Sequence, residues 1–253
     1  MPTTDQAICV RAVDYSETSQ VISVLTREAG LVRLIAKGSK RPKSRSGGRV
    51  DLLAEGSCVF SAGRRESLGV LIEFAETKSH SGLRTDLPTL NAALYMLELC
   101  GELLAEADPH PEVFDLLHSG LDRLARARPA VVLAYFHYRL LRLVGLLGQM
   151  NACASCKGPP GTVGVCFSSG AGGLLCRGCE SAEAEKLPVP GAALAGLAAL
   201  AAVEAGRRPK ISDKQALAVL AVLTYHSEYQ LGKRLKTAGY VVPRSRPRRS
   251  CRP

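Results

Sequence analysis

The stretch Ala7–Lys37, AICVRAVDYSETSQVISVLTREAGLVRLIAK, indicates the fold at the start of this 253-residue chain. Three short segments within it are rich in β-branched residues or alternate between apolar and polar residues: Ala7–Val13, Val21–Thr26 and Leu31–Lys37. Turn-forming residues separate them, at Tyr15–Ser19 and Glu28–Gly30. Short β-branched segments bounded by turns are typical of β-strands. The stretch therefore predicts three consecutive strands.

Two further segments of the same kind follow, Ser57–Ser61 and Leu68–Glu76, each preceded by a stretch that contains glycine. Five short strands in about 75 residues suit a small closed barrel. The OB-fold is a five-stranded barrel of this size and commonly binds oligonucleotides. An SH3-like barrel fits the strand pattern nearly as well.

The pattern changes to helix after Leu83, where apolar residues recur at helical spacing. Five helices are predicted: Leu87–Ala107, Glu112–Arg126, Pro129–Leu147, Pro190–Ala205 and Ser212–Leu231. Pro111 and Pro129 suit the first turn of a helix, and Ser212 suits an N-cap. Residues 151–187 carry a cysteine cluster among many glycines and are predicted as loop. The expected class is α+β, with a barrel followed by helices.

The formal charge of +10 is concentrated in two windows. Residues 29–50 hold seven basic residues and no acid, and residues 232–253 hold eight and no acid, so the remainder of the chain is net negative. Such local basicity favours a polyanionic partner. Residues 1–8 lack the features of a signal peptide, and the apolar stretch Val189–Val203 is too short to span a bilayer. We expect a cytoplasmic protein without membrane contact.

Four cysteines have the spacing of a zinc site: Cys153-x2-Cys156, nineteen residues, then Cys176-x2-Cys179. Two CxxC pairs at this separation can complete a tetrahedron of thiolates around Zn²⁺, with Zn–S distances of about 2.3 Å. Four thiolates leave no open position, which predicts a structural ion. The alternative is a set of buried or redox-active thiols, although no thioredoxin-like context is visible. Cys166, between the pairs, is expected to be a spectator.

A catalytic alternative exists, because His110-Pro111-Glu112 followed by Cys153-x2-Cys156 superficially resembles the signature of zinc deaminases. Ala152 stands where that signature has proline, and the second CxxC pair would saturate the metal. No phosphate loop, dinucleotide fingerprint, HExxH or GxSxG motif occurs in the sequence. We therefore expect neither an enzyme nor a small-molecule substrate.

The first basic window predicts a DNA contact. Its cations lie at the end of a predicted strand and in the following loop: Arg33, Lys37, Lys40, Arg41, Lys43, Arg45 and Arg49. Glycines such as Gly38 let a backbone approach phosphates closely. Only Tyr15, Phe60 and Phe74 could stack on bases in the barrel, so most affinity should come from phosphates. A solvated loop whose charges only aid solubility is the alternative.

The second basic window divides into two parts. Lys233, Arg234 and Lys236 are interpreted as continuing a helix end, where cations complement the helix dipole. The arginine-rich residues 241–253 are interpreted as a disordered tail. This tail suits a second DNA contact and a merely solvated end equally well.

These residues together resemble the DNA repair protein RecO family. The resemblance is carried by Asp14–Ser19, by the basic stretch Ala36–Ser44, by Phe136 to Gly145 before the cysteines, and by Tyr225–Thr237. It covers about residues 6 to 240. It implies an N-terminal OB-fold barrel, an all-helical domain and an inserted four-cysteine zinc module. We expect domains at 1–80, 81–150, 151–187 and 188–240, with the tail at 241–253.

The resemblance also implies a function. Such a protein would mediate homologous recombination by binding single- and double-stranded DNA and annealing complementary strands. With RecR it would help load RecA on DNA coated by single-strand binding protein. Neither annealing nor these protein partners follow from the residues themselves. An RNA-binding OB-fold protein with a zinc module and no annealing activity remains the alternative.

Overall fold

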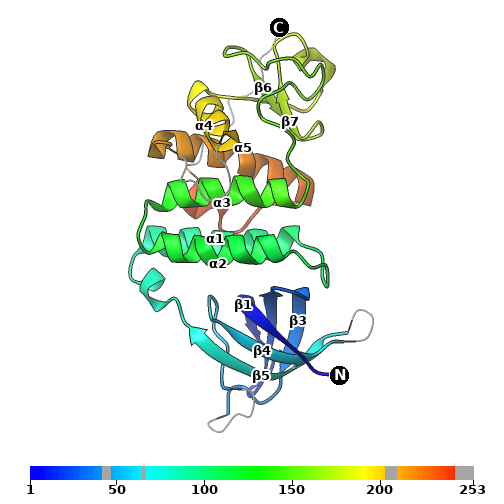
Figure 1. Ribbon diagram of the computed structural model, residues 1–253, viewed down its shortest axis with the longest axis vertical. Helices are drawn as coiled ribbons and strands as arrows, with labels where there is room; N and C mark the ends of the chain where they lie inside the picture. Colours follow the sequence, from blue (N-terminus) through cyan, green and yellow to red (C-terminus); the bar gives the residue numbers. More distant parts are fainter. Residues whose placement is uncertain (42–46, 64–66, 203–209, 243–253) are drawn as a thin grey trace.

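The computed structural model describes residues 1–41, 47–63, 67–202 and 210–242. Figure 1 shows layers stacked along the long axis: a barrel, then helices, then a small sheet at the opposite end. The barrel strands are β1 (Thr3–Asp14), β2 (Gln20–Thr26), β3 (Gly30–Ala36), β4 (Glu55–Ser61) and β5 (Gly69–Lys78). All five coincide with the strands expected from the sequence, within a few residues at each end.

The barrel closes in the order β1-β2-β3-β5-β4, with β4 returning to β1. All neighbouring strands are antiparallel except β3 and β5, whose parallel contact has two residue pairs, Leu34 with Gly69 and Ile35 with Val70. Inward-facing apolar side chains, among them Ile22, fill the interior. The fold class is therefore the expected one, a closed five-stranded barrel followed by helices.

The helical part contains α1 (Leu87–Leu103), α2 (Pro111–Leu124), α3 (Pro129–Leu143), α4 (Gly191–Ala201), α5 (Asp213–Leu231) and the short α6 (Ala238–Val241), with 3-10 turns at Ser81–Arg84 and Glu180–Ala182. Pro111 and Pro129 begin their helices, as expected. Ser212 caps α5 in a reciprocal capping box with Gln215.

Several boundaries differ from the expected ones. α3 ends at Leu143 because Gly145 turns the chain with a φ of 73°. α5 ends at Leu231 because Gly232 adopts the left-handed conformation. Lys233, Arg234 and Lys236 therefore lie beyond the helix, and the expectation that they continue it was wrong. Lys233 pairs with Glu102 of α1 instead, at 2.6 Å.

The segment predicted as loop, residues 151–187, contains short strands. β6 (Cys166–Ser168) pairs with β7 (Gly173–Leu175) on one side and β8 (Leu187–Pro188) on the other. The first two strands are fully buried. Segments of two or three residues are too short to show a hydrophobic period, so the sequence did not reveal this sheet.

The outer face of the barrel meets the first helices. Ile8, Leu25 and Leu31 project from β1, β2 and β3 into the same core as α1 and α2. Gly30 lies so close to the chain between these helices that an added Cβ would approach the carbonyl oxygen of Asp108 to 2.3 Å. Only glycine fits this approach, which fixes the barrel against the helices.

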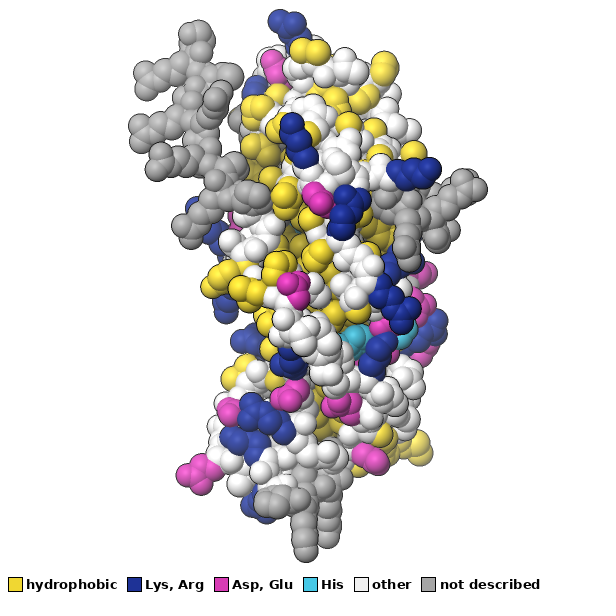
Figure 2. Space-filling model, turned by 90° about the vertical axis from the view of Figure 1, so that its left-hand side faces the viewer, with side chains coloured by type: hydrophobic (Ala, Val, Ile, Leu, Met, Phe, Trp, Pro, Cys, Tyr) yellow, Lys and Arg dark blue, Asp and Glu magenta, His cyan; other side chains and the backbone are white. Residues whose placement is uncertain are grey.

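A polar seam runs along the same junction. Glu55 of β4 is nearly buried, and its carboxylate accepts hydrogen bonds from His80 after β5 (2.9 Å) and His118 of α2 (2.7 Å). Asp122, one turn further along α2, pairs with Lys78. Figure 2 shows basic, acidic and histidine side chains gathered at mid-height on the right-hand side. The seam therefore adds polar contacts between the barrel and α2 to the apolar contacts of the shared core.

Candidate metal centre and nucleic-acid interface

The four predicted zinc ligands meet in space. The sulfur atoms of Cys153, Cys156, Cys176 and Cys179 all lie within 4.8 Å of one another. The Sγ atoms of Cys156 and Cys176 are 3.8 Å apart. Two sulfurs on a tetrahedral zinc, each about 2.3 Å from the ion, would also be about 3.8 Å apart. This arrangement of soft thiols could hold a metal ion with the geometry that zinc prefers.

Tight turns aim the thiols at one point. The N–H of Cys153 bonds to the carbonyl of Gly158, while the N–H of Lys157 bonds back to the carbonyl of Cys153. Lys157 has a positive φ of 64°, which closes the first turn. The second pair forms a similar turn in which the N–H of Cys179 bonds to the carbonyl of Cys176. The two CxxC segments are thus shaped by backbone bonds within and beside them.

The surroundings of the cluster already favour one thiolate. Burial alone would raise the pKa of Cys153, but backbone N–H groups of Cys176, Cys156 and Ser155 outweigh it and bring this pKa down to about 6. Ser155 lowers the pKa of Cys179, whereas hydrogen bonds with Cys176 and Cys156 outweigh it and raise this pKa to about 11. A metal ion bound here would displace the protons that the thiols share.

The cysteine segment is anchored to α5 by polar contacts. Glu185 accepts hydrogen bonds from the N–H groups of Ser169 (2.7 Å) and Gly170 (3.2 Å) and from the hydroxyl of Tyr225. Gln230, on the same helix, donates to the carbonyl of Ser169 at 3.0 Å. The segment that carries the four cysteines is therefore hydrogen-bonded to α5 at the end of the helical core. Cys166 is not among the four clustered sulfurs and contacts Glu180 instead, at 3.2 Å.

In the structure, two cations of the first basic window, residues 29–50, lie close to the carboxylates of Asp14 and Asp51. Asp14, at the end of β1, lies 3.2 Å from the amino group of Lys40 and 3.6 Å from the guanidinium of Arg49. Arg49 also pairs with Asp51 at 3.4 Å. The window is therefore partly neutralised by Asp51, which follows it directly in sequence, and by Asp14, which strand pairing brings beside it. The count of charges along the chain could not reveal the contact with Asp14.

Two of the predicted cations remain without an acidic partner among the described residues. Lys37 and Arg41 are both exposed, on either side of Gly38. Arg33, earlier on β3, pairs with Glu106 at 3.2 Å, and both side chains remain half-exposed. Lys43 and Arg45 lie outside the described residues. The described part of the predicted phosphate contact thus centres on Lys37 and Arg41.

The aromatic residues considered for stacking are mostly inaccessible. Phe60 and Phe74 are buried inside the barrel, 2% and 4% exposed, so they cannot stack on a ligand. Tyr15 is 68% exposed. The sequence also gave no reason to single out Arg11, an exposed cation on β1 whose position becomes apparent only from the strand register.

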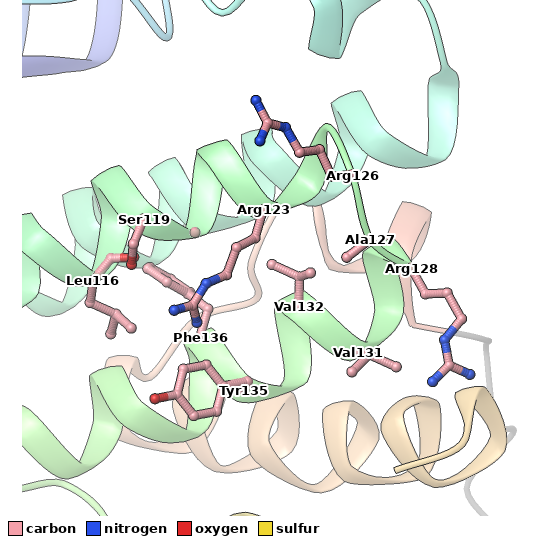
Figure 3. A pocket seen from close by; sticks show the side chains of 11 residues that line it. Leu116, Ser119, Arg123, Arg126, Ala127, Arg128, Val131, Val132, Tyr135 and Phe136 are labelled. Atoms are coloured by element: carbon pink, nitrogen blue, oxygen red, sulfur yellow. The ribbon is translucent and has the colours of Figure 1, made fainter. Parts of the chain in front are cut away.

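A cavity of about 310 Å³ lies between α2 and α3. Figure 3 shows Arg123 reaching from α2 toward Tyr135 and Phe136 of α3, whereas Arg126 points away from the helices. The guanidinium of Arg123 lies 6.0 Å from the centre of the Tyr135 ring. The cavity lining is apolar and cationic, with no carboxylate, histidine or cysteine in it.

The residues of the deaminase alternative are not assembled into one site. His110 contacts the carboxylate of Asp108 at 3.1 Å and is not part of the cysteine cluster. His118, His137 and His226 lie on helices, as expected, and bond to Glu55, Ser227 and the carbonyl of Leu146 respectively. Within the described residues, no helix is both long enough and apolar enough to cross a membrane.

Comparison with known proteins identifies the chain. Residues 1–79 match the family model "Recombination protein O N terminal", and residues 84–238 match "Recombination protein O C terminal". The chain belongs to the RecO family. The barrel corresponds to the first model, and the helices with the cysteine cluster correspond to the second. The resemblance inferred from the sequence is confirmed.

Individual relatives support the same assignment. A DNA repair protein RecO of Anaeromyxobacter sp. (strain K) is 34% identical over 236 residues, which cover 90% of this chain and 91% of the relative. One of Myxococcus xanthus is 33% identical over 243 residues, covering 94% and 96%. One of Rubrobacter xylanophilus is 35% identical over 202 residues, covering 78% and 80%. This RecO family member is therefore a DNA repair protein.

Proposed function

We propose that this protein mediates homologous recombination by binding single- and double-stranded DNA and annealing complementary strands. The observation that carries the proposal is the exposed pair Lys37 and Arg41 beside Gly38, at the end of a barrel strand in a RecO chain. Two DNA strands repel each other through their phosphates. Cations that neutralise phosphates on a barrel surface lower that repulsion, which favours pairing.

The proposed phosphate contact comprises the seven cations of the first basic window: Arg33, Lys37, Lys40, Arg41, Lys43, Arg45 and Arg49. Lys37 and Arg41 are its centre, since acids compete with DNA for Arg33, Lys40 and Arg49. Binding at such a surface depends on phosphates and is therefore expected to be insensitive to base sequence.

The four cysteines are proposed to hold a structural Zn²⁺. Cys153, Cys156, Cys176 and Cys179 would be its ligands, and a bound ion would fix the shape of the segment that Glu185 fastens to α5. Such an ion performs no catalysis, and we propose a non-enzymatic, cytoplasmic protein. The proposed divisions are 1–80, 81–150, 151–187, 188–240 and 241–253.

Its proposed protein partners rest on membership of the family alone. With RecR, the protein would help load RecA on DNA coated by single-strand binding protein. RNA is the main competing ligand, because an OB-type barrel with a zinc module also suits an RNA-binding protein.

The decisive experiment measures strand annealing of complementary oligonucleotides with and without the protein, together with affinity as a function of salt. The variant Lys37→Ala/Arg41→Ala should anneal more slowly. Its slope of log affinity against log salt on single strands should fall by about 1.4, from about 0.7 per lost phosphate contact.

A matched control removes two exposed lysines elsewhere, Lys210→Ala/Lys214→Ala, and should leave annealing and slope unchanged. An unchanged slope in the barrel variant would contradict the assignment of Lys37 and Arg41. Preference for single-stranded RNA over DNA of equal length, without annealing, would favour the RNA-binding alternative.

A further inference from the structure

Strand register places four β-branched side chains in one row across the barrel. Val13 of β1 lies opposite Val21 of β2, Val21 lies opposite Ile35 of β3, and Ile35 lies opposite Val70 of β5. Neighbouring strands are about 4.8 Å apart, so this apolar row is about 14 Å long. The residues come from positions up to 57 apart in sequence (13 and 70), and no local pattern predicts their alignment.

The apolar row faces outward. Ile22, Leu34 and Leu71, each next in sequence to a member of the row, belong to the barrel interior. Side chains alternate between the two faces of a strand, so the row points away from that interior. Val13 is 48% exposed and Val70 is 38% exposed, while Val21 and Ile35 are half-buried.

Three other outward aliphatic residues, one each on β1, β2 and β3, are covered. Ile8, Leu25 and Leu31 lie nearer the helices and are buried against them. The residues of the apolar row also face outward, but no described helix covers them. Two more exposed residues extend the row: Ile72, which is 41% exposed, and Tyr15, which lies two residues beyond Val13. Exposed apolar residues gathered on one outer face of a barrel can form an interaction site.

Cations flank the apolar row on both sides. Two residues closer to the helices, Arg11 of β1 lies opposite Ser23 of β2, and Ser23 lies opposite Arg33 of β3. On the other side of the row, away from the helices, Lys37 lies two residues after Ile35 in the chain. Each step of two residues is about 6.6 Å along a strand. The apolar row therefore has Arg11 and Arg33 on one side and Lys37, together with Tyr15 and Ile72, on the other.

We propose that the apolar row receives the bases of an unpaired DNA strand whose phosphates contact the flanking cations. This proposal rests on the proposed DNA binding and specifies how single strands are distinguished. Unpaired bases expose their apolar faces to water, and burying those faces on aliphatic side chains is favourable. Duplex bases are already stacked inside the helix, so duplex DNA gains only the phosphate contacts. The row thus selects single strands mainly through aliphatic side chains.

The test compares a thymine oligonucleotide with an abasic oligonucleotide of equal length, using the full-length protein. The protein should bind the oligonucleotide with bases more tightly. In the variant Val13→Thr/Val70→Thr, affinity for this oligonucleotide should fall about fivefold, while affinity for the abasic strand and for duplex stays within about twofold. Threonine keeps the β-branched shape, so the strands should be preserved.

A second variant tests the opposite direction. Val70→Tyr adds an aromatic face to the row and should tighten binding of the thymine oligonucleotide only. Equal affinity for the abasic and the thymine strands would overturn the inference and leave the proposed DNA binding intact. Absence of binding to all of these ligands would contradict the proposed function itself. Dissociation of a self-associated protein by Val13→Thr/Val70→Thr in sedimentation would overturn the inference in favour of a second copy of this chain.

Discussion

His137 is a completely buried ionisable residue in the helical core. Its Nε2 bonds to the hydroxyl of Ser227 at 2.8 Å, and its Nδ1 has no partner among the described residues. Burial, with a further effect of nearby His226, lowers the pKa of His137 to about 3. Burial also lowers the pKa of His226. The folded protein therefore keeps both imidazoles neutral at pH values where an unfolded chain would protonate them.

Stability should consequently fall in mild acid. Below the unfolded histidine pKa of about 6.5, the unfolded chain takes up protons that the folded chain refuses, until the pH reaches the folded pKa. Each such histidine lowers the free energy of unfolding by up to about 1.4 kcal/mol per pH unit. Urea denaturation between pH 7.5 and 4.5 measures this loss.

The variant His137→Phe/Ser227→Ala removes one proton-binding group together with its hydroxyl partner. Its free energy of unfolding should therefore decline less steeply over the same pH range, by the equivalent of about one proton. Parallel pH profiles for the variant and the natural protein would show that His137 does not cause the decline.

At the residue scale, the sequence predicted which side chains could act together better than it predicted their burial and their ion-pair partners. The proximity of Cys153, Cys156, Cys176 and Cys179 was predictable, because two CxxC pairs are themselves a sequence pattern. The pairing of Lys40 with Asp14 was not predictable, because Asp14 lies on another strand and only the register of β1, β2 and β3 brings the two together. Burial of Phe60 and Phe74 also depended on which face of each strand turned inward.

Among the elements, β4 and α2 are joined through one carboxylate, Glu55. Burial alone would raise the pKa of Glu55, but hydrogen bonds from His80 and His118 and the charge of His118 outweigh burial and lower this pKa. A carboxyl group with a lowered folded pKa contributes stability above its unfolded pKa. That contribution is lost as the pH falls through the folded pKa.

Glu55→Gln should reduce the free energy of unfolding by about 1–3 kcal/mol at pH 7, because the amide cannot replace a carboxylate that accepts two hydrogen bonds. The difference should shrink below the unfolded pKa near 4.5. Urea denaturation at pH 7 and pH 3.5 checks both statements. Glu76→Gln, at an exposed position of the adjacent strand β5, is the control and should change stability by less than about 0.5 kcal/mol.

Element types were predictable where a period is long enough to recognise. The barrel strands and the five main helices followed from alternation, helical spacing and N-terminal prolines or caps. Their ends were less predictable, since a residue such as Gly232 terminates α5 through its left-handed backbone rather than through any change in hydrophobic pattern. Strands β6 to β8 are held by burial against the helical core, which the sequence does not display.

Across the whole molecule, the cysteine cluster and the barrel lie at opposite ends of the long axis (Figure 1). Phe167 of the cysteine segment packs edge-on against His226 of α5, with ring centres 5.1 Å apart. The segment is thus coupled to the helical core, whereas the barrel contacts α1 and α2 at the far side of that core.

Removal of the proposed Zn²⁺ should therefore change the exchange rates only at the end of the molecule that holds the cysteine segment. After chelation, amide hydrogen exchange should accelerate in residues 150–188 and near the C-terminal turns of α5, because the cysteine segment loses its cross-link. Affinity for single-stranded DNA should stay within about twofold, since the barrel contains none of the cysteine ligands. Exchange that accelerates equally across residues 3–78 would contradict this separation.

The order of the parts was predictable from the change in pattern near Leu83, but their packing was not. Ile8 and Val13 both face outward on β1, yet one is buried by helices and the other is exposed. Nothing in the strand pattern distinguishes them, because the difference arises from helices more than 70 residues away.

The parallel contact between β3 and β5 has a mechanical consequence. It joins the barrel through two residue pairs, fewer than any other contact between neighbouring strands of the barrel, and one of these pairs is Ile35 with Val70. A strand of DNA lying along the apolar row would cross this narrow join and bridge its two sides. Part of the binding free energy of the DNA would then oppose separation of β3 from β5. Bound single-stranded DNA would therefore stabilise the barrel against opening.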